Sequence, residues 1–422
     1  MSVSFLTERH TRVGWAIADQ MLVSGTSFAT TLLIARFLGK AEFGRFVLAW
    51  LAVWIVQNIQ IALITTPITT FAMREPRDRQ AAYFGAICVQ QVAFAAITTT
   101  LVYGLAAASA RVVPSWRLDQ VAGPLACLIL FGQIADIQRR YFYINERTSM
   151  TFGLDLARCG TQIDGLLARF LLFPSLAGLG PVLGVIAAAA LLGALVGWAF
   201  MKPFVFEWST IREVTRKNWS FARWLLGSTL INCARESFVS ISVGSLLGLT
   251  EIGALRAVQQ LVLSINIPLF VMHNIVPAPA SRAYGERGFP GLWGYMKGFA
   301  LKYAMFLCAV LAVIGALGEQ LLTAVYGRGY AGYGWLVTVY AMIMIVFLVR
   351  DFLAIMVKTT EKTDFDFYAS VLGAAFSFAL LFPLIAKFGL AGALLTEALM
   401  HAGMLVMIAR GLKGHWRDRG AA

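Results

Sequence analysis

Charged residues are scarce in this sequence: Asp, Glu, Lys and Arg make up 14% of its 422 residues, whereas hydrophobic residues make up 59%. Soluble globular domains carry about 25% charged and roughly 45–50% apolar residues. A water-soluble fold would lack the polar groups to cover its surface, and the same composition excludes intrinsic disorder. The apolar residues extend along the whole chain, which argues against a domain with a single membrane anchor. The composition therefore predicts a polytopic helical membrane protein.

Motifs of common catalytic and metal chemistry are also missing. The five cysteines form no CxxC pair, which argues against a disulfide framework and a zinc site. The sequence contains no G-x-x-x-x-G-K-[ST] phosphate loop, no H-E-x-x-H zinc motif and no nucleophile elbow. We therefore predict no metal, no cofactor and no enzymatic activity. A proton gradient, a sodium gradient and the membrane potential are the candidate driving forces for a transporter.

Apolar runs predict twelve membrane-spanning helices, at about 20 residues for each span. The predicted ranges are 13–37, 46–72, 81–107, 120–142, 149–173, 180–201, 221–247, 252–280, 294–318, 333–357, 366–386 and 389–410. The longest polar stretch between them predicts a cytoplasmic linker between two six-helix lobes. The expected division is an N-terminal lobe at 1–201, the linker at 202–219, a C-terminal lobe at 220–411 and a cytoplasmic tail at 412–422.

Basic residues outnumber acidic ones, and the formal net charge is +13. With the N-terminus placed in the cytoplasm, the great majority of loop Lys and Arg residues fall on the cytoplasmic side, as the positive-inside rule expects. This asymmetry accounts for the basic charge without a nucleic-acid partner. It also predicts that both termini are cytoplasmic and that the number of helices is even.

The two halves of the chain carry the same turn motif. The segments Leu38–Gly44 and Leu247–Gly253 share the pattern L-G-x-x-E-[FI]-G, and Leu171–Pro174 matches Leu380–Pro383 at the same offset. Two six-helix halves insert with the same orientation, so we expect parallel repeats with a binding site between them near the midplane. Glycine suits a sharp turn and glutamate suits the first turn of the next helix, so we interpret the motif as structural.

Several segments resemble one known family. Ser24–Phe28, Leu33–Gly39, Glu42–Gly44, Gly327–Tyr330 and Phe388–Gly392 are similar to the polysaccharide-transporter branch of the MOP exporter superfamily. The resemblance implies two MATE-like six-helix lobes in a V, with a cavity lined mainly by the first two helices of each lobe. It further implies a flippase in the bacterial cytoplasmic membrane that moves undecaprenyl-diphosphate-linked oligosaccharides for O-antigen, capsule or exopolysaccharide by alternating access. The implied partners are this lipid-linked oligosaccharide and the bilayer, with a polysaccharide polymerase or glycosyltransferases as candidate protein partners.

Polar residues inside the predicted spans supply a candidate substrate site. A charge at the bilayer centre costs roughly 2.5–3.5 kcal/mol on insertion scales, so each one should face protein or water. A guanidinium group stays charged and can bind two diphosphate oxygens, so we predict that Arg235 and Arg256 bind the diphosphate. The predicted cavity-lining residues are Asp19, Asn232, Glu236, Gln259 and Asn266. The alternative is that these side chains only make contacts between helices.

A second group of charges lies in the fourth, fifth and tenth predicted spans. These residues are Asp136, Arg140, Asp155 and Arg158, with Arg350 and Asp351 as the counterpart in the second lobe. We predict an ion-pair network that stabilises each lobe. A cytoplasmic gate is the alternative role for the same residues.

Two other classes of function stay open at this point. An ion-coupled drug or small-solute antiporter of the same superfamily would export dyes and leave surface polysaccharide intact. A membrane polysaccharide polymerase or ligase would need a large external loop to hold its acceptor. The longest predicted external segments, near 108–119 and 319–332, are short.

Overall fold

The computed structural model describes residues 2–72, 75–76, 78–174, 178–262, 276–360 and 363–417. These residues divide into two compact units, Met1–Ala234 and Arg235–Ala422. The described elements are helices, and the described residues contain no strand. The predicted all-helical class is therefore confirmed.

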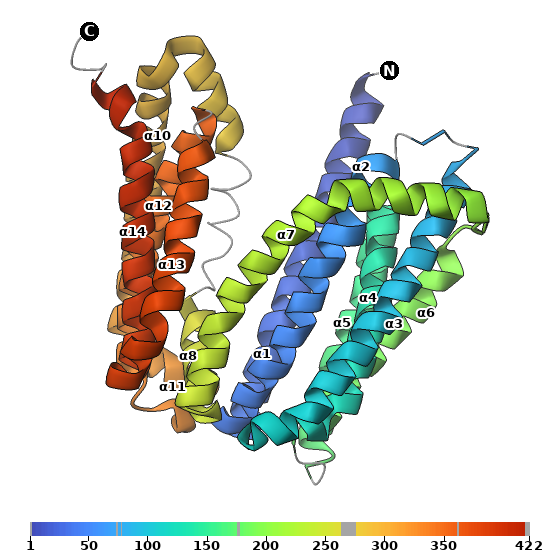
Figure 1. Cartoon of the computed structure of the whole chain (residues 1–422), viewed down its shortest axis with the longest axis horizontal. Helices are drawn as coiled ribbons and strands as arrows, with labels where there is room; N and C mark the ends of the chain where they lie inside the picture. The colour runs from blue at the N-terminus through green and yellow to red at the C-terminus, as the bar shows by residue number, and fades with distance from the viewer. Residues whose placement is uncertain are drawn as a thin grey trace. The chain divides into compact units, whose positions relative to one another are not determined.

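The first unit holds the helices coloured blue to green in Figure 1. Its helices are α1 (Ser2–Gln60), α2 (Thr66–Phe71), α3 (Gln80–Val112), α4 (Ala122–Ile144), α5 (Thr148–Leu171), α6 (Leu179–Phe200) and the first part of α7 (Trp208–Leu246). A π-helical turn at Ile61–Thr65 joins α1 to α2, and the 3-10 turns Pro114–Trp116 and Leu118–Val121 precede α4.

The second unit holds the end of α7 and the helices that follow it. These are α8 (Leu249–Val262), α10 (Pro277–Ala316), α11 (Gly318–Tyr326), α12 (Gly334–Thr359), α13 (Thr363–Phe388) and α14 (Leu390–Arg417), with a 3-10 turn at Arg328–Tyr330. Helix α10 is bent at Arg287 and Gly288, where Gly288 has φ +61°. Pro290 follows the bend and cannot donate a backbone hydrogen bond, which favours the break in the helix.

Eight described helical stretches are long and apolar enough to cross a membrane. They are Gly14–Phe71, Gln80–Val112, Leu118–Ile144, Leu179–Phe200, Pro279–Ala316, Gly334–Thr359, Phe365–Phe388 and Leu390–Lys413. The first of these contains two of the predicted spans. Helices α5, α7 and α8 occupy three further predicted spans but carry more charge or are shorter, and 263–275 lie outside the described residues. The multi-pass membrane fold is confirmed, while the number twelve is supported only roughly.

The first glycine of the repeated turn motif has a positive φ in both units. Gly39 has φ +79° and Gly248 has φ +95°, a region that L side chains rarely adopt. The glutamate three residues later accepts a hydrogen bond from a residue at the start of another helix in each unit. Glu42 accepts a hydrogen bond from the backbone N–H of Leu179 at 3.1 Å, and Glu251 accepts one from the Tyr333 hydroxyl at 2.9 Å. These contacts agree with the structural interpretation of the motif.

The predicted linker 202–219 is only partly non-helical. Residues 202–207 carry no regular structure, and α7 begins at Trp208. Glu207 accepts hydrogen bonds from the hydroxyls of Ser209 at 3.0 Å and Thr210 at 2.8 Å, and these bonds lower the pKa of its carboxyl group. The compact units divide between Ala234 and Arg235, within α7.

Each unit has its own apolar core. In the first unit, Ile64, Tyr83 and Phe142 from three elements pack with Val214 of α7. In the second unit, buried side chains of α10, α12 and α14 form the core. The first turns of α7 are therefore held on the first unit by apolar packing.

Candidate functional site

A buried ion-pair network joins three helices of the first unit. The side chains of Asp19 on α1 and Asp155 on α5 are 1% and 2% exposed, and Arg139 on α4 forms ion pairs with both. The Arg139 Nη2 to Asp19 Oδ2 distance is 2.8 Å, and the Tyr143 hydroxyl donates to the same oxygen at 2.5 Å. Arg158 reaches Asp155 at 2.9 Å. The network balances its carboxylates with guanidinium groups, which is how buried charge is tolerated.

The predicted pair Asp136 and Arg140 is looser than this network. Its Nε to Oδ2 distance is 3.8 Å, and the two residues lie one turn apart on α4. Arg139, its immediate neighbour, was not among the predicted residues, although it carries the contacts between helices. Asp19, which the sequence assigned to the cavity lining, is buried and forms an ion pair with Arg139.

Glutamines form a second buried polar network in the first unit. The Gln60 amide donates to Gln91 Oε1 at 3.1 Å and to the Gln133 carbonyl oxygen at 3.2 Å. Gln91 donates to Gln133 Oε1 at 3.3 Å, and Gln133 donates to the Thr98 hydroxyl at 2.9 Å. These bonds connect α1, α3 and α4 next to the π-helical turn. Buried amides of this kind hold transmembrane helices together, and we assign them a structural role.

The arginine that begins the second unit is paired with its neighbour. Arg235 Nη2 lies 2.6 Å from Glu236 Oε1, and the Glu236 side chain is 55% exposed. Asn232, one turn earlier on α7, is exposed and belongs to the first unit. The predicted polar stripe of this helix therefore presents a carboxylate and a guanidinium group together.

Arg256 on α8 lies in a polar cluster of the second unit. It interacts electrostatically with Glu236 on α7, Tyr326 on α11 and Tyr340 on α12. Tyr340 is buried and hydrogen-bonded to the Glu397 carboxyl group on α14. Glu236 and Glu397 also lie within electrostatic range of each other. Electrostatic interactions thus link one guanidinium, two carboxylates and two phenols from four helices and the short helix α11.

Of two further residues predicted to line the cavity, Gln259 and Asn266, the structure describes only Gln259. Gln259 is half-buried, about one turn beyond Arg256 on α8. Asn266 lies outside the described residues.

The predicted pair of α12 makes a further polar contact with α14. Arg350 Nε donates to Asp351 Oδ1 at 3.2 Å, and Arg350 Nη1 lies 3.1 Å from His401 Nδ1. The Arg350 guanidinium also stacks over the Phe347 ring at 4.5 Å. His401 and Glu397 are four residues apart on α14, which places them on one face. This spacing of polar residues in an apolar helix was the signal that the sequence reading missed.

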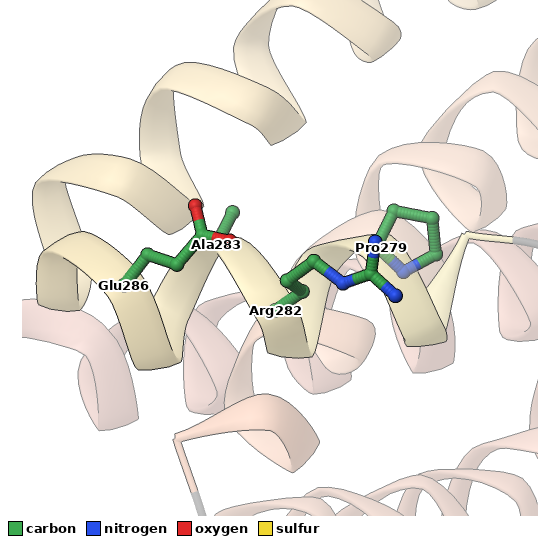
Figure 2. A pocket seen from close by; sticks show the side chains of 4 residues that line it. All are labelled: Pro279, Arg282, Ala283 and Glu286. Carbon is green, nitrogen blue, oxygen red and sulfur yellow. The ribbon is translucent and has the colours of Figure 1, made fainter.

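A shallow pocket of about 310 Å³ lies on α10, in the part of the helix before the bend at Arg287 and Gly288. Its lining residues are Pro279, Arg282, Ala283 and Glu286. Figure 2 shows the Arg282 side chain directed toward Pro279 and the Glu286 carboxylate directed toward Ala283. None of the predicted substrate-binding residues lines this pocket. Among the described residues, no group of three His, Cys, Asp or Glu side chains could hold a metal ion.

Comparison with solved structures decides the fold. The chain is similar to the lipid II flippase MurJ in an inward closed conformation, with a TM-score of 0.70, 10% identity, and coverage of 95% of this chain and 87% of that chain. It is similar to an inward-facing multidrug resistance MATE family transporter of the MOP superfamily, with a TM-score of 0.68, 14% identity and 95% coverage of both chains. This chain has the fold of the MOP superfamily transporters.

A third structure with this MOP fold is a transporter from Pyrococcus furiosus, with a TM-score of 0.60, 13% identity, and coverage of 95% of this chain and 93% of that chain. No family model and no curated protein matches the sequence. The structures named here are a flippase and transporters. The polysaccharide-transporter branch is a finer assignment than the shared fold supports.

Proposed function

We propose that this protein is a flippase for undecaprenyl-diphosphate-linked oligosaccharide repeat units. It moves them from the inner to the outer leaflet of the bacterial cytoplasmic membrane for O-antigen, capsule or exopolysaccharide synthesis. Both termini lie in the cytoplasm in this proposal, as the distribution of basic residues favours. An ion gradient or the membrane potential drives alternating access, and a polymerase or glycosyltransferases handle the oligosaccharide before and after it crosses.

The observation that supports this proposal is the polar cluster around Arg256. Arg256 is an exposed residue, and its guanidinium interacts electrostatically with groups from α7, α11 and α12. A guanidinium binds a diphosphate through two parallel hydrogen bonds, whereas carboxylates, phenols and amides can bind sugar hydroxyls. Arg235 supplies a second cation. Its partner Glu236 is exposed, so Arg235 can exchange this ion pair for one with a substrate anion. The fold shared with a lipid II flippase supports a lipid-linked substrate.

Replacing Arg256 by Gln tests the proposed role in substrate binding. Charge-assisted hydrogen bonds contribute about 1.5–3 kcal/mol each, so one lost bond should weaken substrate binding about 10- to 150-fold. We expect a deletion strain that carries Arg256→Gln to lose surface polysaccharide, and Arg235→Gln to act in the same direction. Arg282→Gln is the matched control, because Arg282 is exposed on α10. Normal polysaccharide from a normally expressed Arg256→Gln protein would contradict the proposal.

An ion-coupled antiporter for cationic drugs is the second candidate. Two carboxylates, Glu236 and Glu397, lie near Arg256, and acidic groups would attract a cation. The similarity to a multidrug resistance transporter supports this reading equally. Efflux of a cationic dye that depends on an imposed proton or sodium gradient, with surface polysaccharide unchanged on deletion of the gene, would favour the antiporter over the flippase.

A further inference from the structure

The first sixteen residues of α7, 208–223, form an amphipathic segment at the flank of the first unit. Its inner face carries Val214, which packs in the apolar core, and Asn218, which donates to Gln90 Oε1 at 3.1 Å. Lys217 on the same side forms an ion pair with Glu75 at 2.7 Å. Figure 1 shows this part of α7 running transverse to the other helices of the unit.

The contact with Gln90 fixes where along α3 this segment lies. Gln90 is ten residues beyond the start of α3 at Gln80, which corresponds to about 15 Å along the helix axis. Segment 208–223 therefore packs against the side of α3 rather than only on its end. Because α3 is long and apolar enough to span the membrane, the segment lies against a candidate span, near the end at which that span begins.

That outer face combines tryptophan with arginine. Trp208 is 77% exposed, Trp219 is 55% exposed, and Arg212 and Arg216 are exposed between them. At 3.6 residues per turn, these four side chains fall within an arc of about 80°. Arg223 lies within the same arc and is also exposed. Aromatic side chains with arginines on one helix face are typical of a helix at a membrane surface.

The acidic residues nearby do not cancel this charge. Glu213 is paired with Arg79 at 3.8 Å, and the Glu207 carboxylate accepts bonds from Ser209 and Thr210 at the start of the helix. Among the described residues, Arg212 and Arg216 take part in no ion pair. The face is therefore cationic, and its complement at a membrane surface is an anionic lipid headgroup.

The segment is also held firmly enough to act as a fixed surface. The Val205 N–H donates to the Ala81 carbonyl oxygen at 3.3 Å, which fastens the chain just before α7. Gly85 allows the backbone around Val205 to approach α3, since a Cβ at this position would lie 2.1 Å from the Val205 carbonyl oxygen. The arginines are therefore presented on an ordered helix rather than on a loop.

We propose that the outer face of 208–223 is a binding site for anionic phospholipids of the cytoplasmic leaflet. Arg212 and Arg216 bind the lipid phosphates, and Trp208 and Trp219 lie at the level of the headgroups. The site belongs to the first unit alone. It is independent of the substrate proposed above, because none of these residues belongs to the cluster around Arg256.

Native mass spectrometry of the full-length protein in detergent tests this site by titration with phosphatidylglycerol and, separately, phosphatidylcholine. We expect the wild-type protein to prefer phosphatidylglycerol. Each basic residue near an anionic surface contributes about 1 kcal/mol, so Arg212→Gln with Arg216→Gln should weaken phosphatidylglycerol binding about 25-fold. A photoreactive phosphatidylglycerol analogue should crosslink to 208–223, and inorganic phosphate should not displace the lipid.

Two further variants make the outcome decisive. Arg111→Gln with Arg328→Gln removes the same charge from exposed sites on the predicted external side, and it should leave lipid binding unchanged. Arg212→Lys with Arg216→Lys keeps the charge and should keep the preference, which separates lost binding from lost folding. Equal binding of the two lipids by the wild-type protein, or wild-type affinity in the Gln double variant, would overturn the proposal. Polysaccharide export by the Arg256 variants does not bear on either result.

Discussion

Arg139 provides the sharpest test of what holds the first unit together. Its side chain forms ion pairs with Asp19 and Asp155, whose side chains are 1% and 2% exposed. Removing one partner of a buried pair leaves an uncompensated charge and costs about 3–5 kcal/mol. In Arg139→Gln, Asp155 keeps Arg158 and Asp19 keeps the Tyr143 hydroxyl. We therefore expect the lower end of this range, about 3 kcal/mol in the free energy of unfolding.

The neighbouring Arg140 supplies the matched control. Its side chain is 36% exposed and lies 3.8 Å from Asp136, so Arg140→Gln should cost less than about 1 kcal/mol. Thermal unfolding of the full-length protein in detergent ranks the variants. Combining Asp19→Asn with Arg139→Gln removes the uncompensated carboxylate, so this double variant should regain stability over Arg139→Gln alone.

Two outcomes would refute the reasoning. Equal melting temperatures for Arg139→Gln and Arg140→Gln would mean that the buried pairs contribute little to stability. Failure of Asp19→Asn to improve Arg139→Gln would mean that shape rather than charge is the cause. Transport lost at an unchanged melting temperature would instead favour the alternative role of the network as a gate.

Two other predictions concern the turns and the linker. Burial and the hydrogen bond to Glu251 raise the pKa of Tyr333 to about 12, so the neutral phenol stabilises the fold below pH 10 and this contribution is lost as the pH rises toward 12. In thermal melts between pH 9 and 12, the difference in melting temperature between the wild-type protein and Tyr333→Phe should therefore shrink. A difference that stays constant over this range would contradict the assignment. Gly85→Ala should lower the melting temperature because its Cβ would meet the Val205 carbonyl oxygen. Gly104 lies on the same helix, and a Cβ there would meet no neighbour within 4 Å, so Gly104→Ala should leave the melting temperature equal or higher. Identical effects of the two substitutions would show that the close approach at Gly85 is unimportant.

Hydropathy was sufficient to predict the class of fold, because an apolar run of adequate length has few alternatives in a membrane. The repeated turn was also predictable, since Gly39 and Gly248 occupy backbone conformations that glycine favours. Helix α7 was harder to delimit. Its first turns carry Arg212, Arg216 and Lys217, which lowers the hydropathy of a segment that is helical because it packs along the first unit.

Partners across helices could not be predicted from the sequence. Asp19 and Arg139 are 120 residues apart, and spacing along one helix says nothing about which residue lies opposite on another. The sequence identified Asp19 as a costly intramembrane charge but did not identify Arg139, which compensates it. Glu397 was overlooked because its connection to Tyr340 exists only in three dimensions.

The bond from the Leu179 N–H to Glu42 has a consequence for how the first unit is made. The two residues are 137 positions apart, so at about 5–20 residues per second a ribosome needs roughly 7–27 s to supply the partner of this carboxylate. During that interval Arg45, three residues away and 3.3 Å from Glu42 in the finished fold, is the counter-ion within reach. Glu42 can thus pair with Arg45 while the chain is being synthesised and bind the Leu179 N–H once α6 has been made.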